Sequence, residues 1–233
     1  MCNSDGMNEL IGKIHLGDCM EVLRGLPDKC VDLLLTDPPY GTGGDYDTAL
    51  RYGGRWGKYK DGTALSRANG RDLGDKVQKK IHDWDTAPSA EVFAELFRVS
   101  REQIIWGGNY FSLPPTRCFN VWRKLTISEG FTMAMCEYAW CSFNRNAKWW
   151  EFAPQDPERF HPTQKPLALI ARQIEEYTEP GALILDPFSG SGTTAVAAHM
   201  LGRRFICIEK DEDYWRASVE RLDKVRAQGL LGI

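Results

Sequence analysis

Four consecutive residues, Asp37, Pro38, Pro39 and Tyr40, follow the apolar run 31–35 and combine an acid, a stiff backbone and an aromatic ring. The Asp37 carboxylate and the Pro38 carbonyl can accept both hydrogens of an amino group conjugated to an aromatic ring. Such acceptance localises the nitrogen lone pair, which is otherwise delocalised into the ring. The prolines restrict the backbone, and the Tyr40 ring offers a face for base stacking. In isolation the tetrapeptide also fits an Asp-Pro turn with a packed tyrosine.

A second group of residues lies in the stretch "LDPFSGSGTT". Gly190 and Gly192 allow a ligand to approach the backbone closely, and Thr193 opens a helix with its partial positive charge. Glu209 ends the next strand, 23 residues after Asp186, where a carboxylate can accept both hydroxyls of a ribose. The pattern predicts a site for an adenosine-containing cofactor. The alternative is an ordinary strand–helix turn that needs glycine for tight packing.

The residues around the glycines favour one cofactor over others. The loop lacks the third glycine of the dinucleotide fingerprint, and the phosphate-binding Walker pattern is absent. Asp186 precedes the loop and would repel a pyrophosphate, whereas it suits the sulfonium and amino groups of S-adenosyl-L-methionine. Phe188 either packs under the cofactor's adenine or fills the core. We therefore expect S-adenosyl-L-methionine as the cofactor.

The elements that must position these residues alternate between strands and helices. The run 31–36 is continuously apolar, as expected of a strand buried on both faces of a parallel sheet. Seven candidate strands predict a Rossmann-like α/β fold with a mostly parallel sheet and helices on both faces. Strands between 102 and 143 have little helix between them, which indicates an antiparallel edge. Ligands bind such sheets beyond the carboxyl ends of the strands.

We expect a single domain, 1–233, with three functional regions. Residues 11–40 form the catalytic strand and loop, and 161–216 form the cofactor-binding half. Residues 41–83 form a glycine-rich loop in which 51–80 holds nine Lys/Arg against three Asp, an excess of 9 − 3 = +6. This charge is compatible with contact to DNA phosphates, and equally with a solvated loop.

Composition excludes several classes of protein. The net charge is −3, and the seven cysteines form no CxxC pair, which argues against a zinc ribbon or redox centre. His15, His82 and His199 lack metal-ligand spacing, so we expect no metal. The longest apolar runs are too short to span a bilayer, and the first residues do not read as a signal peptide. These features predict a cytoplasmic protein in a reducing compartment with no membrane partner.

Four motifs, "DPPYG", "HPTQKP", "LDPFSGSGTT" and "ICIEKDEDYW", occur in this order. Together they resemble the amino-group DNA methyltransferases of the beta class, in which the catalytic half precedes the cofactor half. The resemblance implies the methyltransferase variant of the Rossmann-like fold. It also places Asp18 near the adenine of the cofactor, and Lys165 near its methionine end.

The resemblance implies a site-specific enzyme that methylates adenine N6 in double-stranded DNA after the base has flipped out of the duplex. An acid in the first position of the tetrapeptide accompanies mostly adenine in this family. Cytosine N4 is the alternative, followed by RNA or a protein glutamine, and then by a DNA-binding regulator without turnover. A homodimer and a cognate restriction endonuclease are further partners that the family suggests.

Two other features need an interpretation. His161 lies in a proline-bounded turn, where orienting the loop is favoured over catalysis. Trp149, Trp150 and Phe152, beside Lys148, form an aromatic patch that either stacks on bases or is buried against the sheet or a second copy.

Overall fold

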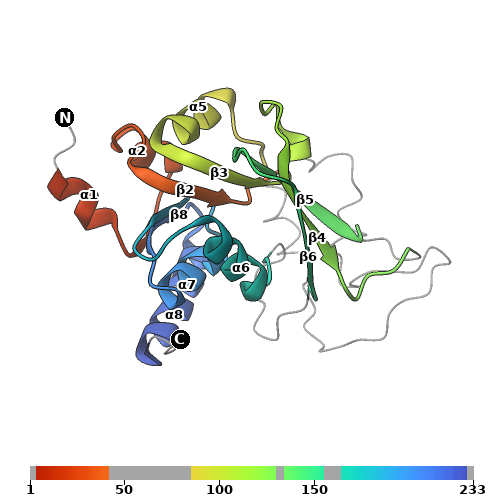
Figure 1. Cartoon of the computed structure of the whole chain (residues 1–233). Coiled ribbons are helices and arrows are strands. Elements are labelled where there is room, and N and C mark those ends of the chain that lie inside the picture. Colours follow the sequence, from red (N-terminus) through yellow and green to blue (C-terminus); the bar gives the residue numbers. More distant parts are fainter. Residues whose placement is uncertain (1–3, 42–84, 130–133, 155–163, 230–233) are drawn as a thin grey trace.

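The computed structural model describes residues 4–41, 85–129, 134–154 and 164–229 (Figure 1). The predicted basic loop 41–83, apart from Gly41, and His161 lie outside the described residues.

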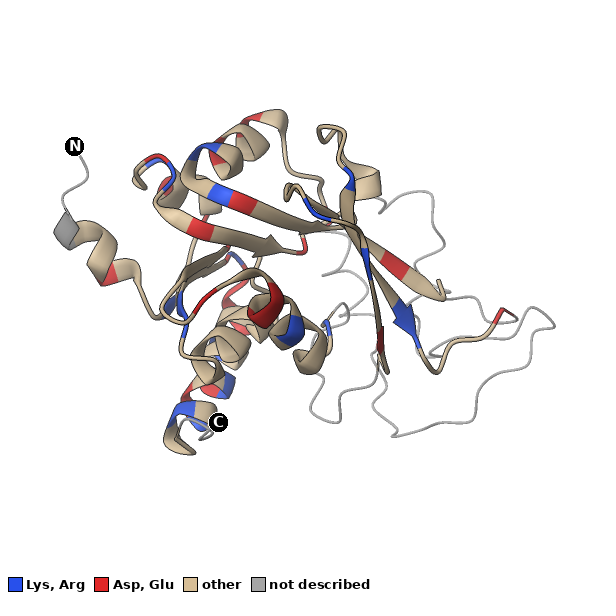
Figure 2. Ribbon diagram, in the orientation of Figure 1, with Lys and Arg blue, Asp and Glu red and all other residues tan. Residues whose placement is uncertain are grey.

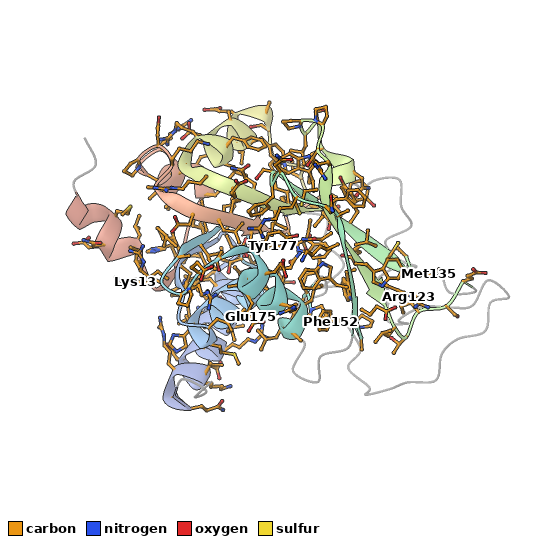
Figure 3. All side chains as sticks on the ribbon, in the orientation of Figure 1. Lys13, Arg123, Met135, Phe152, Glu175 and Tyr177 are labelled. Atoms are coloured by element: carbon orange, nitrogen blue, oxygen red, sulfur yellow. The ribbon has the colours of Figure 1, made fainter. Side chains whose placement is uncertain are left out.

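The described strands form one eight-stranded sheet, and the predicted Rossmann-like α/β class is confirmed. The strands in spatial order are β1 (Lys13–Leu16), β8 (Arg204–Glu209), β7 (Leu183–Asp186), β2 (Val31–Thr36), β3 (Ser100–Trp106), β5 (Cys136–Cys141), β4 (Cys118–Lys124) and β6 (Lys148–Phe152). In Figure 3, the labels Lys13, at the start of β1, and Met135, next to the start of β5, mark the two sides of this sheet.

Two details of the sheet differ from expectation. The sequence predicted seven strands, and the eighth is β6, which pairs in parallel with β4 at the sheet edge. Among the described strands the antiparallel one is β5, which lies between β3 and β4 and pairs antiparallel with both. The antiparallel strand is therefore the third from the edge of the sheet and not the edge strand itself.

Helices cover both faces of the sheet, as predicted (Figure 1). One face carries α2 (Cys19–Leu23) and α5 (Ala90–Val99), and the other carries α6 (Leu167–Tyr177), α7 (Thr193–Met200) and α8 (Glu212–Ala227). Two short helices, α1 (Ser4–Leu10) and the 3₁₀ turn η1 (Gly108–Tyr110), complete the described elements. Within the described ranges no helix is long and apolar enough to cross a membrane.

Two hydrophobic clusters, one on each face, hold the layers together. Leu34 of β2 packs with α2 and α5 residues such as Leu23 and Leu96. Its neighbours Leu33 and Leu35 point to the opposite face and join the cluster under α6, α7 and α8. All three leucines are fully buried, as expected of the central part of a strand that lies between two helix layers.

Local signals set where the helices begin. The Ser89 hydroxyl accepts a hydrogen bond from Val92 N–H and so forms the N-cap of α5. The Asp211 carboxylate caps α8 in the same way through Asp213 and Tyr214. Basic and acidic residues are interspersed along α5 and α8 (Figure 2), and Arg216–Glu212 is one of the ion pairs between successive turns of α8.

Gly192, the residue before α7, gives a test of the packing between α7 and α8. It has a positive φ of 72°, and an added Cβ would lie 2.9 Å from Ser218 Cβ. Gly202 has a similar φ of 68° with nothing within 4 Å, so it is the matched control. We expect Gly202→Ala to lower the free energy of unfolding by about 1–2 kcal/mol from backbone strain alone. Gly192→Ala should cost about 1–3 kcal/mol more, because a packed neighbour must shift.

Urea denaturation of the two variants and the wild type measures the difference. Equal losses for both variants would contradict the close approach of α7 and α8 at this point.

Candidate active site

The carboxyl ends of the central parallel strands meet at one edge of the sheet. The edge carries Asp18 after β1, Glu209 at the end of β8, Asp186 at the end of β7, Asp37 after β2 and Gly107 after β3. The two sequence motifs lie 149 residues apart in the chain, Asp37 against Asp186, yet β2 and β7 are hydrogen-bonded neighbours. The fold therefore brings the predicted acceptor and cofactor groups together.

Asp37 is held through both of its carboxylate oxygens. The Tyr40 hydroxyl donates a hydrogen bond to Asp37 Oδ1 at 2.6 Å, and the Lys165 ammonium donates to Oδ2. Burial strongly raises the pKa of Tyr40, and the charge of Asp37 adds to the effect, so the hydroxyl remains a donor. An ionised carboxylate has about four acceptor positions, so two remain for a further N–H group. Asp37 is thus a fixed acceptor.

The Tyr40 ring has an aromatic neighbour that sequence reasoning missed. Tyr110 stacks on it with ring centroids 4.6 Å apart and an interplanar angle of 18°. Phe111 meets the ring edge at 6.2 Å. Gly107 packs so closely that an added Cβ would lie 2.2 Å from Tyr40 Cε1. One face of Tyr40 is therefore covered by a side chain that is itself 45% exposed. The motif "GGNYF", directly after β3, was the available signal.

Lys165 lies beside the Asp37 carboxylate. Its ammonium contacts Asp37 and lies 3.1 Å from Glu137 Oε2 of β5. It also stands 5.3 Å from the centroid of the Trp106 ring at the end of β3. The position near the methionine end of the cofactor, which the resemblance implied, stays a prediction. Glu137 was not singled out from the sequence, because nothing in "CEYAWC" indicates a buried cation opposite it.

Asp186 is buried at the end of β7 and joins the two halves of the site. Its Oδ1 accepts hydrogen bonds from the Thr36 hydroxyl of β2 at 2.8 Å and from Phe188 N–H at 3.2 Å. Burial raises the pKa of Asp186 from 3.8 to about 6, with a smaller contribution from the charge of Asp37. A carboxylate that is costly to ionise in this position gains from a cationic ligand.

Glu209 is fixed by the backbone around it. Its Oε2 accepts from Gly190 N–H at 2.7 Å and its Oε1 from Asp211 N–H at 2.8 Å. Burial raises the pKa of Glu209, and these amide hydrogen bonds oppose the rise. Each oxygen keeps lone pairs for a hydroxyl, so the side chain retains the capacity that the ribose prediction requires. Asp18, on the neighbouring strand end, caps α2 through Met20 N–H at 2.8 Å.

The glycine loop leads into the buried start of α7. Gly190 and Gly192 both have positive φ, 51° and 72°. The Thr193 hydroxyl, buried, contacts Ser191 Oγ and Arg221 within the protein. The predicted contribution of Thr193 to cofactor binding would therefore come from its backbone at the start of α7.

The residues present fit a cationic adenosine ligand. Three carboxylates, Asp18, Asp186 and Glu209, lie along the ends of β1, β7 and β8, so a pyrophosphate would be repelled there. Ser189 in the same loop is buried, and its hydroxyl has no hydrogen-bond partner among the described residues. No group of three His, Cys, Asp or Glu side chains in the described part of the chain could hold a metal ion.

The aromatic patch predicted at 148–152 is divided by the strand that contains it. Trp149 of β6 is 62% exposed, whereas Trp150 is buried in the core, and Phe152 packs against that core. Successive strand residues point to opposite faces, so the three rings do not form one surface.

Comparison with known proteins identifies the family. A family model described as DNA methylase matches residues 114–220. YubD of Escherichia coli (strain K12), which bears the description of a methylase, is 31% identical over 229 residues, 90% of this chain and 89% of its own. The type II methyltransferase M2.MboI of Moraxella bovis is 25% identical over 250 residues, 91% of this chain and 88% of its own.

The fold also matches a solved methyltransferase complex. The crystal structure of M1.HpyAVI with S-adenosyl-L-methionine superposes with a TM-score of 0.56 at 21% identity, over 91% of this chain and 98% of that one. S-adenosyl-L-methionine is the cofactor of this family, and the carboxylate-lined edge suits it. The motif order, the geometry at the ends of β2 and β7 and these likenesses agree: the chain belongs to the amino DNA methyltransferases, the N6/N4 family.

Proposed function

We propose that this enzyme is a site-specific methyltransferase that acts on the N6 amino group of adenine in double-stranded DNA. The observation that carries the proposal is the state of Asp37. Its carboxylate is oriented at both oxygens, by Tyr40 and Lys165, and it follows the strand that neighbours β7, at whose end lies Asp186. A fixed carboxylate acceptor beside a cofactor site is what an amino group of low nucleophilicity requires.

The residues divide the work between acceptance, stacking and cofactor binding. Asp37 and the Pro38 carbonyl accept the two amino hydrogens, and Pro39 keeps the carbonyl in place. Tyr40 contributes an aromatic surface to a base that has flipped out of the duplex. When bound, S-adenosyl-L-methionine would supply the methyl group: the N–C bond would form as the C–S bond breaks, with the electron pair of that bond going to sulfur. The proton lost from the amino nitrogen would pass to the Asp37 carboxylate and from there to water.

The cofactor would be held by the residues at the other strand ends. Asp18 and Glu209 lie at the ends of β1 and β8, where Glu209 accepts the ribose hydroxyls. Asp186 faces the cationic part, and Phe188 packs on the adenine. Gly190, Gly192 and Thr193 present the backbone of the loop and the start of α7. Adenine is favoured over cytosine because the first residue of the tetrapeptide is an acid.

The first experiment tests the chemistry and the base together. The protein is incubated with S-adenosyl-L-methionine and unmethylated DNA, which is digested to nucleosides and analysed by mass spectrometry. We expect N6-methyladenine from the wild type. Asp37→Asn should lower the rate by about 10²–10³-fold, the typical loss on removing one preorganised electrostatic contact. Asp223→Asn, in an exposed ion pair of α8, is the control and should retain the wild-type rate.

Other products would revise the proposal in defined ways. N4-methylcytosine would keep the mechanism and change the base. Methylation of RNA or protein, with none of DNA, would overturn the proposed substrate.

A second prediction concerns Tyr110, which packs on the Tyr40 ring. Tyr110→Ala removes the stacking partner that keeps Tyr40 and its hydroxyl directed at Asp37. Aromatic pairs contribute about 0.5–1.5 kcal/mol beyond buried area, so the single-turnover rate should fall roughly 2- to 12-fold. Tyr110→Phe keeps the ring and should retain the rate. A faster Tyr110→Ala enzyme would contradict this role and show that Tyr110 blocks the face needed by the base.

A third prediction concerns the pH dependence of cofactor binding. The pKa of Asp186 is about 6 in the folded protein, above the ordinary value of 3.8. The folded protein therefore binds this proton more tightly than the unfolded chain does, and protonation of Asp186 stabilises the folded state. This contribution to stability is complete below about pH 4 and disappears as pH rises through 6. A cationic ligand favours the ionised form instead. The Kd for S-adenosyl-L-methionine should therefore rise up to about tenfold per pH unit below 6.

Calorimetric titrations between pH 5 and 7.5 measure this dependence. The Asp186→Asn variant should bind S-adenosyl-L-methionine more weakly, and its Kd should not change between pH 5 and 7.5. A wild-type Kd that does not change with pH would place the cofactor's positive charge away from Asp186.

A further inference from the structure

The catalytic carboxylate is the first of four charged side chains of alternating sign. Asp37 contacts Lys165, Lys165 lies 3.1 Å from Glu137 Oε2, and Lys124 lies 2.6 Å from Glu137 Oε1. Arg123 and Met135, labelled in Figure 3, mark the part of β4 and β5 from which Lys124 and Glu137 come. Lys124 and Glu137 lie outside the four sequence motifs.

The four residues come from separate parts of the chain. Asp37 follows β2, Lys165 precedes α6, Glu137 lies in β5 and Lys124 ends β4. Both lysine side chains are only 7% exposed. A buried charge is costly unless it is paired, and here two acids offset two lysines. The row is therefore electrically neutral only when Glu137 is present.

The two central members of the row hold their charges strongly. Burial lowers the pKa of Lys165, but the attraction of Asp37 and Glu137 outweighs this and raises the pKa above its usual range. Burial raises the pKa of Glu137, but Lys165 and Lys124 outweigh it and lower the pKa to about 2. Lys165 is thus a permanent cation that two carboxylates share.

This sharing matters for the reaction assigned above. During methyl transfer the accepting nitrogen becomes positively charged beside Asp37. An uncompensated Lys165 would repel that charge and draw electron density from Asp37, which would make it a weaker acceptor. Glu137 compensates the charge of Lys165 from 3.1 Å. It also fixes where the ammonium stands, together with the Trp106 ring.

We propose that Glu137 is a positioning residue for methyl transfer: it holds and neutralises Lys165, which in turn orients Asp37 toward the target amino group. The proposal rests on the proposed DNA methyltransferase function and adds to it two residues, Glu137 and Lys124, that lie outside the motifs. Glu137 need not touch the base or the cofactor, because it acts through Lys165.

The test is a double-mutant cycle on the full-length protein, with single-turnover methylation of DNA as the readout. Glu137→Gln keeps the shape and removes the charge. We expect a rate about 10- to 100-fold lower, the usual cost of losing a partner that orients a reactive group, with KM values for DNA and cofactor within about threefold. In a Lys165→Met background the same change should alter the rate less than about threefold, because the residue through which Glu137 acts is gone.

Two controls separate this role from a structural one. Glu151→Gln breaks the exposed Arg123–Glu151 ion pair between β4 and β6 and should keep the wild-type rate. Lys124→Met combined with Glu137→Gln removes one charge of each sign, so it keeps the buried row balanced if Glu137→Gln alone folds poorly. This double variant should stay slow, because Lys165 still lacks its second partner.

The outcomes are distinct. Equal losses from Glu137→Gln with and without Lys165, or recovery of the rate in the balanced double variant, would overturn the proposal. So would a Glu137→Gln enzyme with a lower melting temperature and an unchanged rate. A wild-type protein that methylates neither adenine nor cytosine in DNA would overturn the proposed function, and this proposal with it.

Discussion

The hydrogen bond between Thr36 and Asp186 marks the constraint on which the site depends, the adjacency of β2 and β7. Each strand delivers one acid to the same edge of the sheet: Asp37, the proposed contact of the target amino group, and Asp186, the proposed contact of the cofactor. Because parallel strands end together, two motifs 149 residues apart in the chain become one site. The buried hydroxyl–carboxylate contact then fixes the relative height of the two strands, and with it the spacing of the two half-sites.

A site with four acids at one edge must limit their mutual repulsion, and it does so by giving each a different partner. Asp18 accepts from the start of α2, Glu209 from two loop amides, Asp186 from a hydroxyl, and Asp37 from a tyrosine and a lysine. Among these four acids, Asp37 is the one that contacts a buried cation. This difference agrees with the proposed roles, because the cofactor would bring positive charge to Asp186, whereas the neutral base would bring none to Asp37 before the reaction.

The parts of the structure that follow from local pattern could be predicted from the sequence, and those set by distant contacts could not. The largely apolar run 31–36 contains its own signal, and it was correctly interpreted as a buried strand. β6 was missed because Trp149 and Trp150 were interpreted as one patch, while strand alternation sends them to opposite faces. The contacts of Tyr110 with Tyr40 and of Glu137 with Lys165 join distant parts of the chain, so no sequence spacing reveals them, although "GGNYF" after β3 marked the position of Tyr110. The motif residues themselves were found because their chemistry is concentrated in a few consecutive positions.

The pairing of β1 with β8 has a consequence for how such a chain can be arranged. β1 is the first strand and β8 the last, yet Gly12 N–H donates to Phe205 O, and the Trp215 indole of α8 donates to Ile14 O at 2.8 Å. The beginning and the end of the sheet therefore lie next to each other. A short covalent connection from the end of α8, where Arg226 donates to Gly12 O, to the start of β1, with a new opening between the two halves, would preserve every described strand pair. The fold therefore does not fix the order of the two halves in the sequence. Circularly permuted chains can build the same site.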